Sequence, residues 1–519
     1  MAVLVVKRSI MHRYQSIGQA IEEAMPGDMI EIRDGIYEES LDISKRLTLY
    51  GVGNVTIKGG VFIRYQTHVD MRNLRFRQGQ GLYIKGDLQL ENCIIEEQLI
   101  RTQMMVSYGS LLMKNCAVLA TSLNHFGLRV ANGSSVILVD TTFEHHVKAQ
   151  IIAQNCELTL TNCLLLEGKK HGIFAIRHVK LVLEDCEIHG HAKAQIIAAA
   201  SEMAMTNCLV HQGQGVGIQL FDGTTLRMDG CEIKEHLDTN MVVHRSELMI
   251  ADSIFSDGQG HGLYLGEKTE AKLYDCQFYR HVKAQILIEH SQVEFRKCHI
   301  RNGMAVGVAI VDEADVSLTE CQIQNHQQFH IIVDASGLQL RQSTIQFGQS
   351  GGIYGNDHAK IMMQHTMIRE LQSHHIYINN ARLFTQYCTF EQMQGNGITC
   401  IDAIFEVAHS YFKDGQESPY AMIWSDQSMG RIEHCTVDEA ARPFLALSNK
   451  SLMEMRHTDI HAVKAPAVVQ ENSQLFVQGQ VHTGTWQKDA ASKVSSIEGM
   501  QVMKDHKIEI QKHDIKKII

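Results

Sequence analysis

A seven-residue segment that returns at a fixed spacing constrains the fold of this 519-residue chain more than any other feature. The sequence His-Val-Lys-Ala-Gln-Ile-Ile begins at His146, and close copies begin at His191 and His281. The first two copies lie 45 residues apart and the third lies 90 residues further on, with a weaker copy from His236 between them. A fixed period over this length indicates an array of stacked units, so fold and function must both be derived from the repeat.

A column of small residues divides each 45-residue unit into two coils of 22 or 23 residues. Its members are Cys93, Cys116, Thr141, Cys163, Cys186, Cys208, Cys231, Ser253, Cys276, Cys298, Cys321, Ser343, Thr366, Cys388, Ser410, Cys435 and Thr458. An apolar-x-apolar pair such as Leu158 and Leu160 precedes each member, and an apolar residue such as Ile188 follows two positions later. Three short alternating strands per coil explain this pattern, whereas a helical period does not. We expect the column to point inward, because free cysteine is among the most buried residue types.

The N-terminal segment carries a resemblance to a known class. Ser16-Ile17-Gly18-Gln19 predicts the start of a short helix, which Pro26-Gly27-Asp28 ends. This helix, the Asp-Gly-x-Tyr-x-Glu turn and Leu-Thr-Leu-x-Gly lie between Ile17 and Ile57. Together they resemble the opening of right-handed parallel β-helix proteins of the pectin-lyase-like class, which includes carbohydrate-binding and sugar-hydrolase repeat proteins. The resemblance implies an all-β, single-stranded right-handed parallel β-helix and leaves the activity open.

Three segments are expected along the chain. Residues 1–60 would form the N-terminal helix cap and the first coils, and residues 61–472 the β-helix repeats. The period is lost in residues 473–519, which would form an irregular C-terminal cap or tail.

The repeated segment also provides the candidate binding surface. His, Lys and Gln stand at i, i+2 and i+4, which places them on one face of a strand, and the intervening alanine favours the core for the other face. The interpretation is therefore an outward stripe, whose large side chains lie between coils that carry glycine at the same positions. Its members are His146, Lys148, Gln150, His191, Lys193, Gln195, His281, Lys283 and Gln285. His326 and His330 are expected to face outward as well. Two interpretations remain open: a recognition surface for an acidic partner, or a solvated face repeated by duplication.

Composition narrows the classes of partner. A formal net charge of −10 argues against general binding of nucleic acid, which needs a basic footprint. No stretch approaches the ~20 apolar residues that a membrane span needs. The 13 cysteines without an export signal favour reduced thiols and a cytoplasmic protein.

Catalytic and metal-binding signatures are not found in the sequence. Histidines of the stripe stand two coils, about 10 Å, apart, too far to share a zinc ion whose ligands lie ~2 Å from it, so no metal and no cofactor are expected. Gly260-His261-Gly262 resembles a motif of polygalacturonase-type hydrolases, but the Asp-Asp pair that should accompany it occurs nowhere in the chain. If a site formed from different coils, His236, Asp238 and His281 would be its candidates.

The sequence thus predicts a non-catalytic scaffold that presents the stripe to a partner protein or an acidic ligand. The alternative is a carbohydrate-active enzyme, a lyase, hydrolase or epimerase, that acts on an acidic polysaccharide. Paired carboxylates on adjacent coils would favour the enzyme.

Overall fold

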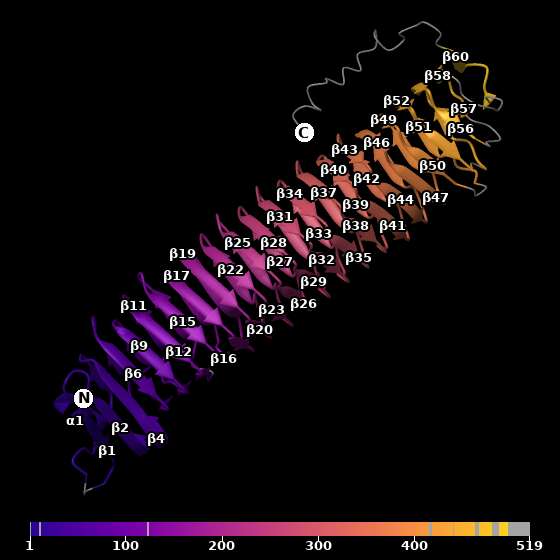
Figure 1. Cartoon of the computed structure of the whole chain (residues 1–519). Coiled ribbons are helices and arrows are strands. Elements are labelled where there is room, and N and C mark those ends of the chain that lie inside the picture. The colour runs from indigo at the N-terminus through magenta and orange to yellow at the C-terminus, as the bar shows by residue number, and fades with distance from the viewer. Residues whose placement is uncertain are drawn as a thin grey trace. The chain divides into compact units, whose positions relative to one another are not determined.

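The computed structural model describes residues 2–9, 12–121, 124–414, 418–439, 441–461, 467–479 and 487–496. These residues form the predicted all-β fold, in which parallel strands follow one another along the whole described chain and α1 (Ile17–Glu23) is the one helix among them (Figure 1). In this part of the chain no helix has the length and apolar character to cross a bilayer. By contacts between Cα atoms the chain divides into unit 1, Met1–Ala309 with Ala314–Val316, and unit 2, Ile310–Glu313 with Ser317–Ile519.

Unit 1 begins with the predicted cap. The strand β1 (Val3–Val6) pairs in parallel with β2 (Met29–Tyr37), and α1 packs beside them with Ile17, Ala20 and Ile21 buried. The side chain of Ser16 accepts a hydrogen bond from the amide of Gln19, as the capping-box pattern predicts. The carboxylate of Glu39 accepts the amides of Ile17 and Gly18, each at 2.8 Å, which satisfies two further donors of the first turn.

Each later coil of unit 1 contributes one strand to each of three ladders, which we name first, second and third in the order of the chain within a coil. The long strands β4 (Leu47–Ile57), β17 (Ala149–Thr161) and β19 (His171–Glu184) contribute to two ladders each. The other first-ladder strands are β6 (His68–Arg72), β9 (Asp87–Glu91), β12 (Ser110–Lys114), β15 (Ser135–Val139), β22 (Glu202–Thr206), β25 (Thr225–Asp229), β28 (Glu247–Ala251), β31 (Glu270–Tyr274) and β34 (Gln292–Arg296). The second-ladder strands are β7 (Arg75–Arg77), β10 (Ile94–Glu96), β13 (Ala117–Leu119), β16 (Thr142–Glu144), β18 (Leu164–Leu166), β20 (Glu187–His189), β23 (Leu209–His211), β26 (Glu232–Lys234), β29 (Ile254–Ser256), β32 (Gln277–Tyr279) and β35 (His299–Arg301). The third-ladder strands are β3 (Leu41–Ile43), β5 (Val61–Ile63), β8 (Leu82–Ile84), β11 (Thr102–Ser107), β14 (Phe126–Ala131), β21 (Ile196–Ala199), β24 (Ile218–Phe221), β27 (Met241–His244), β30 (Leu263–Gly266) and β33 (Ile286–Glu289).

The boundary between the units falls within β36 (Val308–Val311) and β37 (Asp315–Thr319). After these strands, unit 2 has the same three ladders. Its first-ladder strands are β40 (Gly337–Arg341), β43 (Lys360–Gln364), β46 (Arg382–Gln386), β49 (Ile404–Ala408), β52 (Met429–Glu433), β55 (Leu452–Arg456), β58 (Gln474–Gln478) and β60 (Lys493–Ser496). The second-ladder strands are β38 (Gln322–Gln324), β41 (Thr344–Gly348), β44 (Met367–Leu371), β47 (Thr389–Met393), β50 (Tyr411–Lys413), β53 (Thr436–Asp438) and β56 (Asp459–Ile460). The third-ladder strands are β39 (Ile331–Asp334), β42 (Ile353–Asn356), β45 (Ile376–Asn379), β48 (Ile398–Ile401), β51 (Ile423–Asp426), β54 (Leu445–Ser448), β57 (Ala467–Val469) and β59 (Gln487–Lys488). The ladders therefore run past residue 472, where the sequence predicted that the regular repeat ends; residues 497–519 lie outside the described ones.

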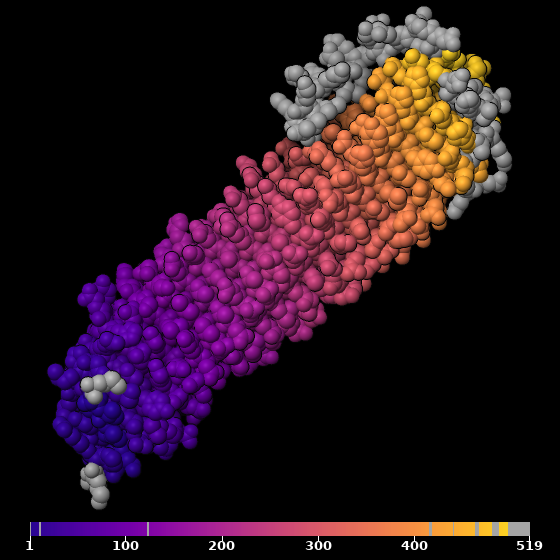
Figure 2. Space-filling model, viewed as in Figure 1, coloured from indigo at the N-terminus to yellow at the C-terminus, as the bar shows by residue number. Residues whose placement is uncertain are grey.

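The predicted column of small residues lies inside the coils, and this prediction is confirmed. All 13 cysteines are buried free thiols, including Cys156 and Cys400 outside the column. A representative thiol, Cys186, donates to the carbonyls of Glu184 at 3.2 Å and of Leu160 in the preceding coil at 3.5 Å. Alternating apolar side chains fill the rest of the interior, and in the space-filling view side chains close the gaps between the ribbons (Figure 2).

Candidate functional site

The histidines and amides of the repeated segment are buried, which contradicts the predicted outward orientation. His146, Gln150, His191, Gln195, His281 and Gln285 are all 0% exposed. Only Lys148, Lys193 and Lys283 face the solvent. The outward His/Lys/Gln stripe is therefore wrong as a surface, because its imidazoles and amides line the interior of the coil.

The reason for the error is that the segment begins in a turn: the strand that follows starts only after Gln195 and Gln285 in two copies, and at Ala149 in the copy from His146. β21 begins only at Ile196, and residues 190–195 connect the second ladder to the third. Side chains at i, i+2 and i+4 share a face only in a strand, so the alternation does not apply to this connection. Within it, His191 and Gln195 turn into the coil and Lys193 turns out.

Glycines in the neighbouring coils provide the room that these buried side chains need. A Cβ atom on Gly168 would lie 2.5 Å from Cδ2 of His191, and one on Gly217 would lie 2.6 Å from Nε2 of His236. The sequence correctly predicted that the glycines leave space between coils for the large side chains. That space lies inside the solenoid, where close packing leaves no other place for an imidazole.

Burial holds the imidazole of His281 in a neutral state. Nδ1 contacts the carbonyl oxygen of the Gln285 side chain, and Nε2 lies 3.0 Å from the amide nitrogen of Asn240. That nitrogen donates its two hydrogens to the backbone carbonyls of Ile233 and Ser256, both at 2.9 Å, so its orientation is set and it has no hydrogen left for Nε2. Burial lowers the pKa of His281 to about 4.

Other histidines at this turn behave in the same way. Burial lowers the pKa of His146 to about 3 and that of His236 to about 4. These residues are uncharged at neutral pH and have no contact with solvent, so they are unsuited to acid–base catalysis.

The candidate constellation of His236, Asp238 and His281 does not assemble. The two imidazoles are buried, whereas Asp238 is exposed and its carboxylate accepts the amide of Thr239 at 2.7 Å. The wall of the coil separates the carboxylate from both rings.

Unit 2 also fills this turn with buried polar groups. His326 and His330, which were expected to face outward, are both 0% exposed, and their rings meet edge to face with centroids 5.0 Å apart. Further along, the guanidinium of Arg442 donates to the carbonyls of Met393 and Gly395, each at 2.7 Å, and forms a buried ion pair with Asp414. Like the histidines, this pair belongs to the interior.

The lysines at the turn of unit 1 belong to a row of basic side chains on successive coils. Its members are Arg101, His125, Lys148, Lys170 and Lys193, which we call the basic ridge. Backbone hydrogen bonds align them: the amide of His125 donates to the carbonyl of Arg101 at 2.7 Å, that of Lys148 to His125 at 2.9 Å, and that of Lys193 to Lys170 at 2.8 Å. Successive members are therefore separated by about 4.8 Å, the spacing of strands in a sheet.

The charges of the ridge act on one another. Partial burial lowers the pKa of His125, and the charges of Lys148, Arg101 and Lys170 lower it further. Lys170 and Lys193 likewise add to the effect of burial in lowering the pKa of His171. Among the described residues, no carboxylate lies within ion-pairing distance of the four permanent cations of the ridge.

The structure brings Lys148 and Lys193 together and leaves Lys283 apart. Between Lys193 and Lys283 the same turn position holds Gly215, Asp238 and Gly260 on consecutive coils. Lys283 is thus four coils, about 19 Å, beyond Lys193. Sequence reasoning missed Arg101, His125 and Lys170, although Lys170 stands 22 residues after Lys148 and 23 before Lys193, which are the lengths of one coil.

Two partly exposed apolar side chains, Ile152 and Phe174, border the ridge on the third ladder, and the buried Ile197 follows them. Ile152 lies in register with Phe174, and Phe174 with Ile197. The ring of Phe174 contacts that of His171, with centroids 5.9 Å apart. The ridge and these two side chains together combine positive charge with apolar surface.

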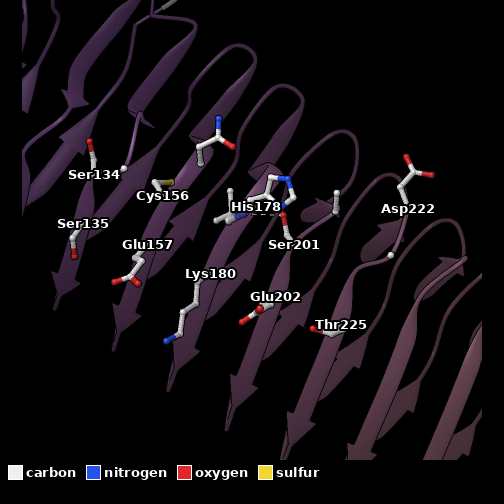
Figure 3. A pocket seen from close by; sticks show the side chains of 15 residues that line it. Ser134, Ser135, Cys156, Glu157, His178, Lys180, Ser201, Glu202, Asp222 and Thr225 are labelled. Atoms are coloured by element: carbon white, nitrogen blue, oxygen red, sulfur yellow. Dashed lines mark hydrogen bonds between the residues drawn. The ribbon is translucent and has the colours of Figure 1, made fainter.

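A groove of about 720 Å³ lies elsewhere on unit 1, beside the N-terminal ends of the first-ladder strands between residues 133 and 225. Glu157, Lys180 and Glu202 occupy matching positions on β17, β19 and β22 and stand side by side along it (Figure 3). All three are exposed, and Asp222 contributes a further carboxylate to the lining. The groove can hold an elongated polar ligand, and its lining carries more acidic than basic side chains.

Comparisons with known proteins place the fold in a family. The sequence matches the family described as right handed beta helix region over residues 48–202, 151–292, 242–370 and 284–416. The search of curated proteins found no match.

Solved structures resemble the chain at low identity. The A-module of the mannuronan C-5 epimerase AlgE4 of Azotobacter vinelandii is 11% identical, with 73% of this chain and 90% of that chain covered and a TM-score of 0.28. The periplasmic alginate epimerase AlgG is 10% identical, with 67% and 81% covered and a TM-score of 0.31. The tailspike protein 3 of bacteriophage CBA120 is 10% identical, with 82% and 59% covered and a TM-score of 0.36. We draw no functional inference from scores this low. The family match covers well over half of the sequence, and the chain belongs to the right-handed β-helix family.

Proposed function

We propose that this β-helix protein is a non-catalytic scaffold that binds an extended acidic ligand along the basic ridge of unit 1. The observation that carries the proposal is the row of basic side chains on successive coils, four of them exposed permanent cations, in a chain whose formal net charge is −10. Concentrating positive charge in one row of an acidic protein costs repulsion between neighbours, and a ligand with spaced carboxylates relieves it.

The buried part of the same turn supports this role. His146, Gln150, His191 and Gln195 pack inside the coil directly beneath Lys148 and Lys193. A wall packed in this way holds the backbone of each lysine at a fixed position, so a ligand pays little ordering entropy to meet the row. The cations therefore present a regular array to which an acidic segment of a partner protein or an acidic polysaccharide could bind in extended form.

The strength of such binding follows from exposed ion pairs. Each pair contributes about 0.2–1 kcal/mol, so the ridge alone yields weak binding that salt screens. The bordering side chains of Ile152 and Phe174 add contact area that is insensitive to salt. We expect affinity that falls with ionic strength and retains an apolar component.

Charge reversal tests the proposal. We expect the triple variant Lys148→Glu, Lys170→Glu, Lys193→Glu to lose about tenfold to hundredfold in affinity for a polyuronate chain or a polyglutamate peptide, measured by calorimetry at low salt. The matched control reverses Lys114, Lys272 and Lys297, three exposed lysines outside the ridge, with the same change in net charge. Equal binding by wild type, variant and control would disprove the ridge as the binding surface, as would failure of both probes to bind the wild type.

Cytoplasmic localisation remains part of this proposal. The 13 free thiols support it, because neighbouring cysteines of the column would be exposed to oxidation during folding in an oxidising compartment.

The groove beside Glu157, Lys180 and Glu202 supports a second candidate, a carbohydrate-active enzyme. Glu157 and Glu202 stand two strands apart, about 9.6 Å between their backbones, which is near the upper end of the separation of carboxyl groups in inverting glycosidases. The acidic excess favours a neutral sugar over an acidic one. Turnover of a neutral polysaccharide that disappears in both Glu157→Gln and Glu202→Gln would favour this candidate, and no turnover would remove it.

A further inference from the structure

Three side chains that are unrelated to the ridge meet on the outer face of the second ladder. Glu187 and His189 lie at i and i+2 of β20, so both point to the same side of the strand. His211 ends the next strand, β23, directly in register with His189. The three residues are thus held by two neighbouring strands of one ladder.

The distances between their polar atoms are short. Nε2 of His211 lies 2.9 Å from Oε1 of Glu187, and Nε2 of His189 lies 3.7 Å from the same oxygen. The two imidazole centroids are 4.7 Å apart. One nitrogen from each ring and one carboxylate oxygen all lie within 4.8 Å of one another, and this is the one such trio among the described residues.

The surroundings are less polar than those of an ordinary surface cluster. Leu164 and Leu166 of the preceding coil lie in register with Glu187 and His189, and Leu209 lies in register with Glu187 on the other side. The side chain of His211 is only 12% exposed and that of His189 only 24%. Flanking leucines reduce the access of water and strengthen electrostatic interactions at the site.

The nearest lysine along the ladder does not compete for the carboxylate. Lys234 is in register with His211 on the following strand, and its ammonium group is paired with Glu232 at 3.0 Å. The carboxylate of Glu187 therefore remains with the two imidazoles.

We propose that Glu187, His189 and His211 form a binding site for a divalent transition-metal ion, with Zn²⁺ the best fit. Two imidazole nitrogens and one carboxylate oxygen are a ligand set that suits zinc, whereas Ca²⁺ and Mg²⁺ prefer oxygen alone. Ligands at about 2.0–2.2 Å from zinc in a tetrahedron stand about 3.4 Å apart, so the present separations need only rotations of side chains. A fourth position stays open to water or to a ligand from a partner.

The ladder explains why these residues can share a metal although the histidines of the repeated segment cannot. His189 and His211 stand on consecutive coils, whereas the repeated histidines stand two coils apart. The sequence contains the signal as Glu-x-His followed by a second His one coil length, 22 residues, later. At the equivalent positions 45 and 90 residues later the corresponding pairs are Glu232 with Lys234 and Gln277 with Tyr279, which cannot complete such a set.

Metal binding by the full chain tests the proposal. We expect calorimetry with ZnCl₂ to show one site per chain that the variants His189→Gln and His211→Gln weaken at least tenfold, since each removes one of three ligands. The control is His290→Gln, an exposed histidine on another turn. Co²⁺ provides an independent readout, because a tetrahedral site with nitrogen and oxygen ligands gives visible absorption that the two variants should lose.

Stability separates loss of the site from loss of folding. Binding to the folded state alone should raise the melting temperature of the wild type in excess Zn²⁺, and should not raise that of His211→Gln. The variants should keep the wild-type melting temperature without metal. Zinc binding of equal affinity in the wild type and both ligand variants would overturn the proposal, as would no binding to a correctly folded wild type.

Discussion

The buried imidazole of His281 makes the stability of its coil depend on pH. Burial lowers its pKa from 6.5 to about 4 in the folded protein. Above pH 6.5 the residue is neutral in both the folded and the unfolded state, so its contribution to stability is fully present there. As the pH falls from 6.5 to 4, the unfolded state binds a proton that the folded state excludes, and stability is lost.

The magnitude follows from the difference in pKa. At pH 5 the unfolded imidazole is almost fully protonated and the folded one is not, which costs about 2 kcal/mol, since one pKa unit corresponds to ~1.4 kcal/mol. This loss equals a decrease of about 30-fold in the protection of backbone amides that open together with the residue.

Hydrogen exchange detected by mass spectrometry measures this effect locally, in peptides that cover β32 and β33. After correction for the intrinsic exchange rate, we expect the wild type to lose about 30-fold more protection than His281→Gln between pH 7 and pH 5. The exposed residue His290 provides the control variant His290→Gln, which should follow the wild type. If His281→Gln loses as much protection as the wild type, the imidazole is not held neutral by burial and the reasoning fails.

Three further perturbations test the interior of the solenoid. Gly262→Ala places a Cβ 2.5 Å from the carbonyl oxygen of Gln285 and should lower the free energy of unfolding by about 1–3 kcal/mol in urea titrations, more than Gly215→Ala, whose nearest contacts would be at 3.1 Å. Arg442→Met leaves the carboxylate of Asp414 buried without its cation and should cost about 3–5 kcal/mol by the same titration; adding Asp414→Asn should restore more than half of this loss, and no recovery would refute the ion-pair account. All 13 cysteines should resist a polar thiol reagent in the native protein and react after denaturation, and rapid labelling of native thiols would contradict the inward column.

The sequence predicted the fold well because the period of a solenoid repeats every local signal. The column that contains Cys186 and the flanking pair Leu181 and Leu183 appear once per coil, so each coil confirms the previous one. The N-terminal helix was predictable from Ser16 and its capping pattern. Ladders that continue past residue 472 were missed, since the later coils lose the repeated residues while the backbone pairing of β55 with β58 persists.

The site was predicted less well because the period of the sequence does not determine which side chains of a turn point inward and which point outward. His191, Lys193 and Gln195 have the spacing of a strand face, and only the position at which β21 begins shows that they are in a connection. Lys170 and the trio at Glu187 involve contacts between neighbouring coils. Such contacts become visible in the sequence only once the length of each coil is known.

Buried donors at the turn between the second and third ladders explain why polar residues were selected there. Backbone carbonyls inside a coil must find partners, and the turn leaves several without a strand neighbour. Gln98 donates to the carbonyl of Phe76 at 2.8 Å, Asn124 to that of Gln98 at 2.8 Å, and Gln150 to that of Phe143 at 2.9 Å.

Different side chains therefore donate hydrogen bonds to buried backbone carbonyls at equivalent places. In unit 2 the guanidinium of Arg442 donates to the carbonyls of Met393 and Gly395. The recurring His-x-Lys-x-Gln segment therefore combines a pattern of buried residues, His and Gln, with a pattern of exposed lysines. Its first and last residues are buried and restricted by packing, whereas the lysine between them is exposed. Because Lys148 and Lys193 are exposed, we expect substitutions there to leave the fold intact. Their repetition in line with Arg101 and Lys170 is therefore the part of the pattern that binding of an acidic ligand would explain.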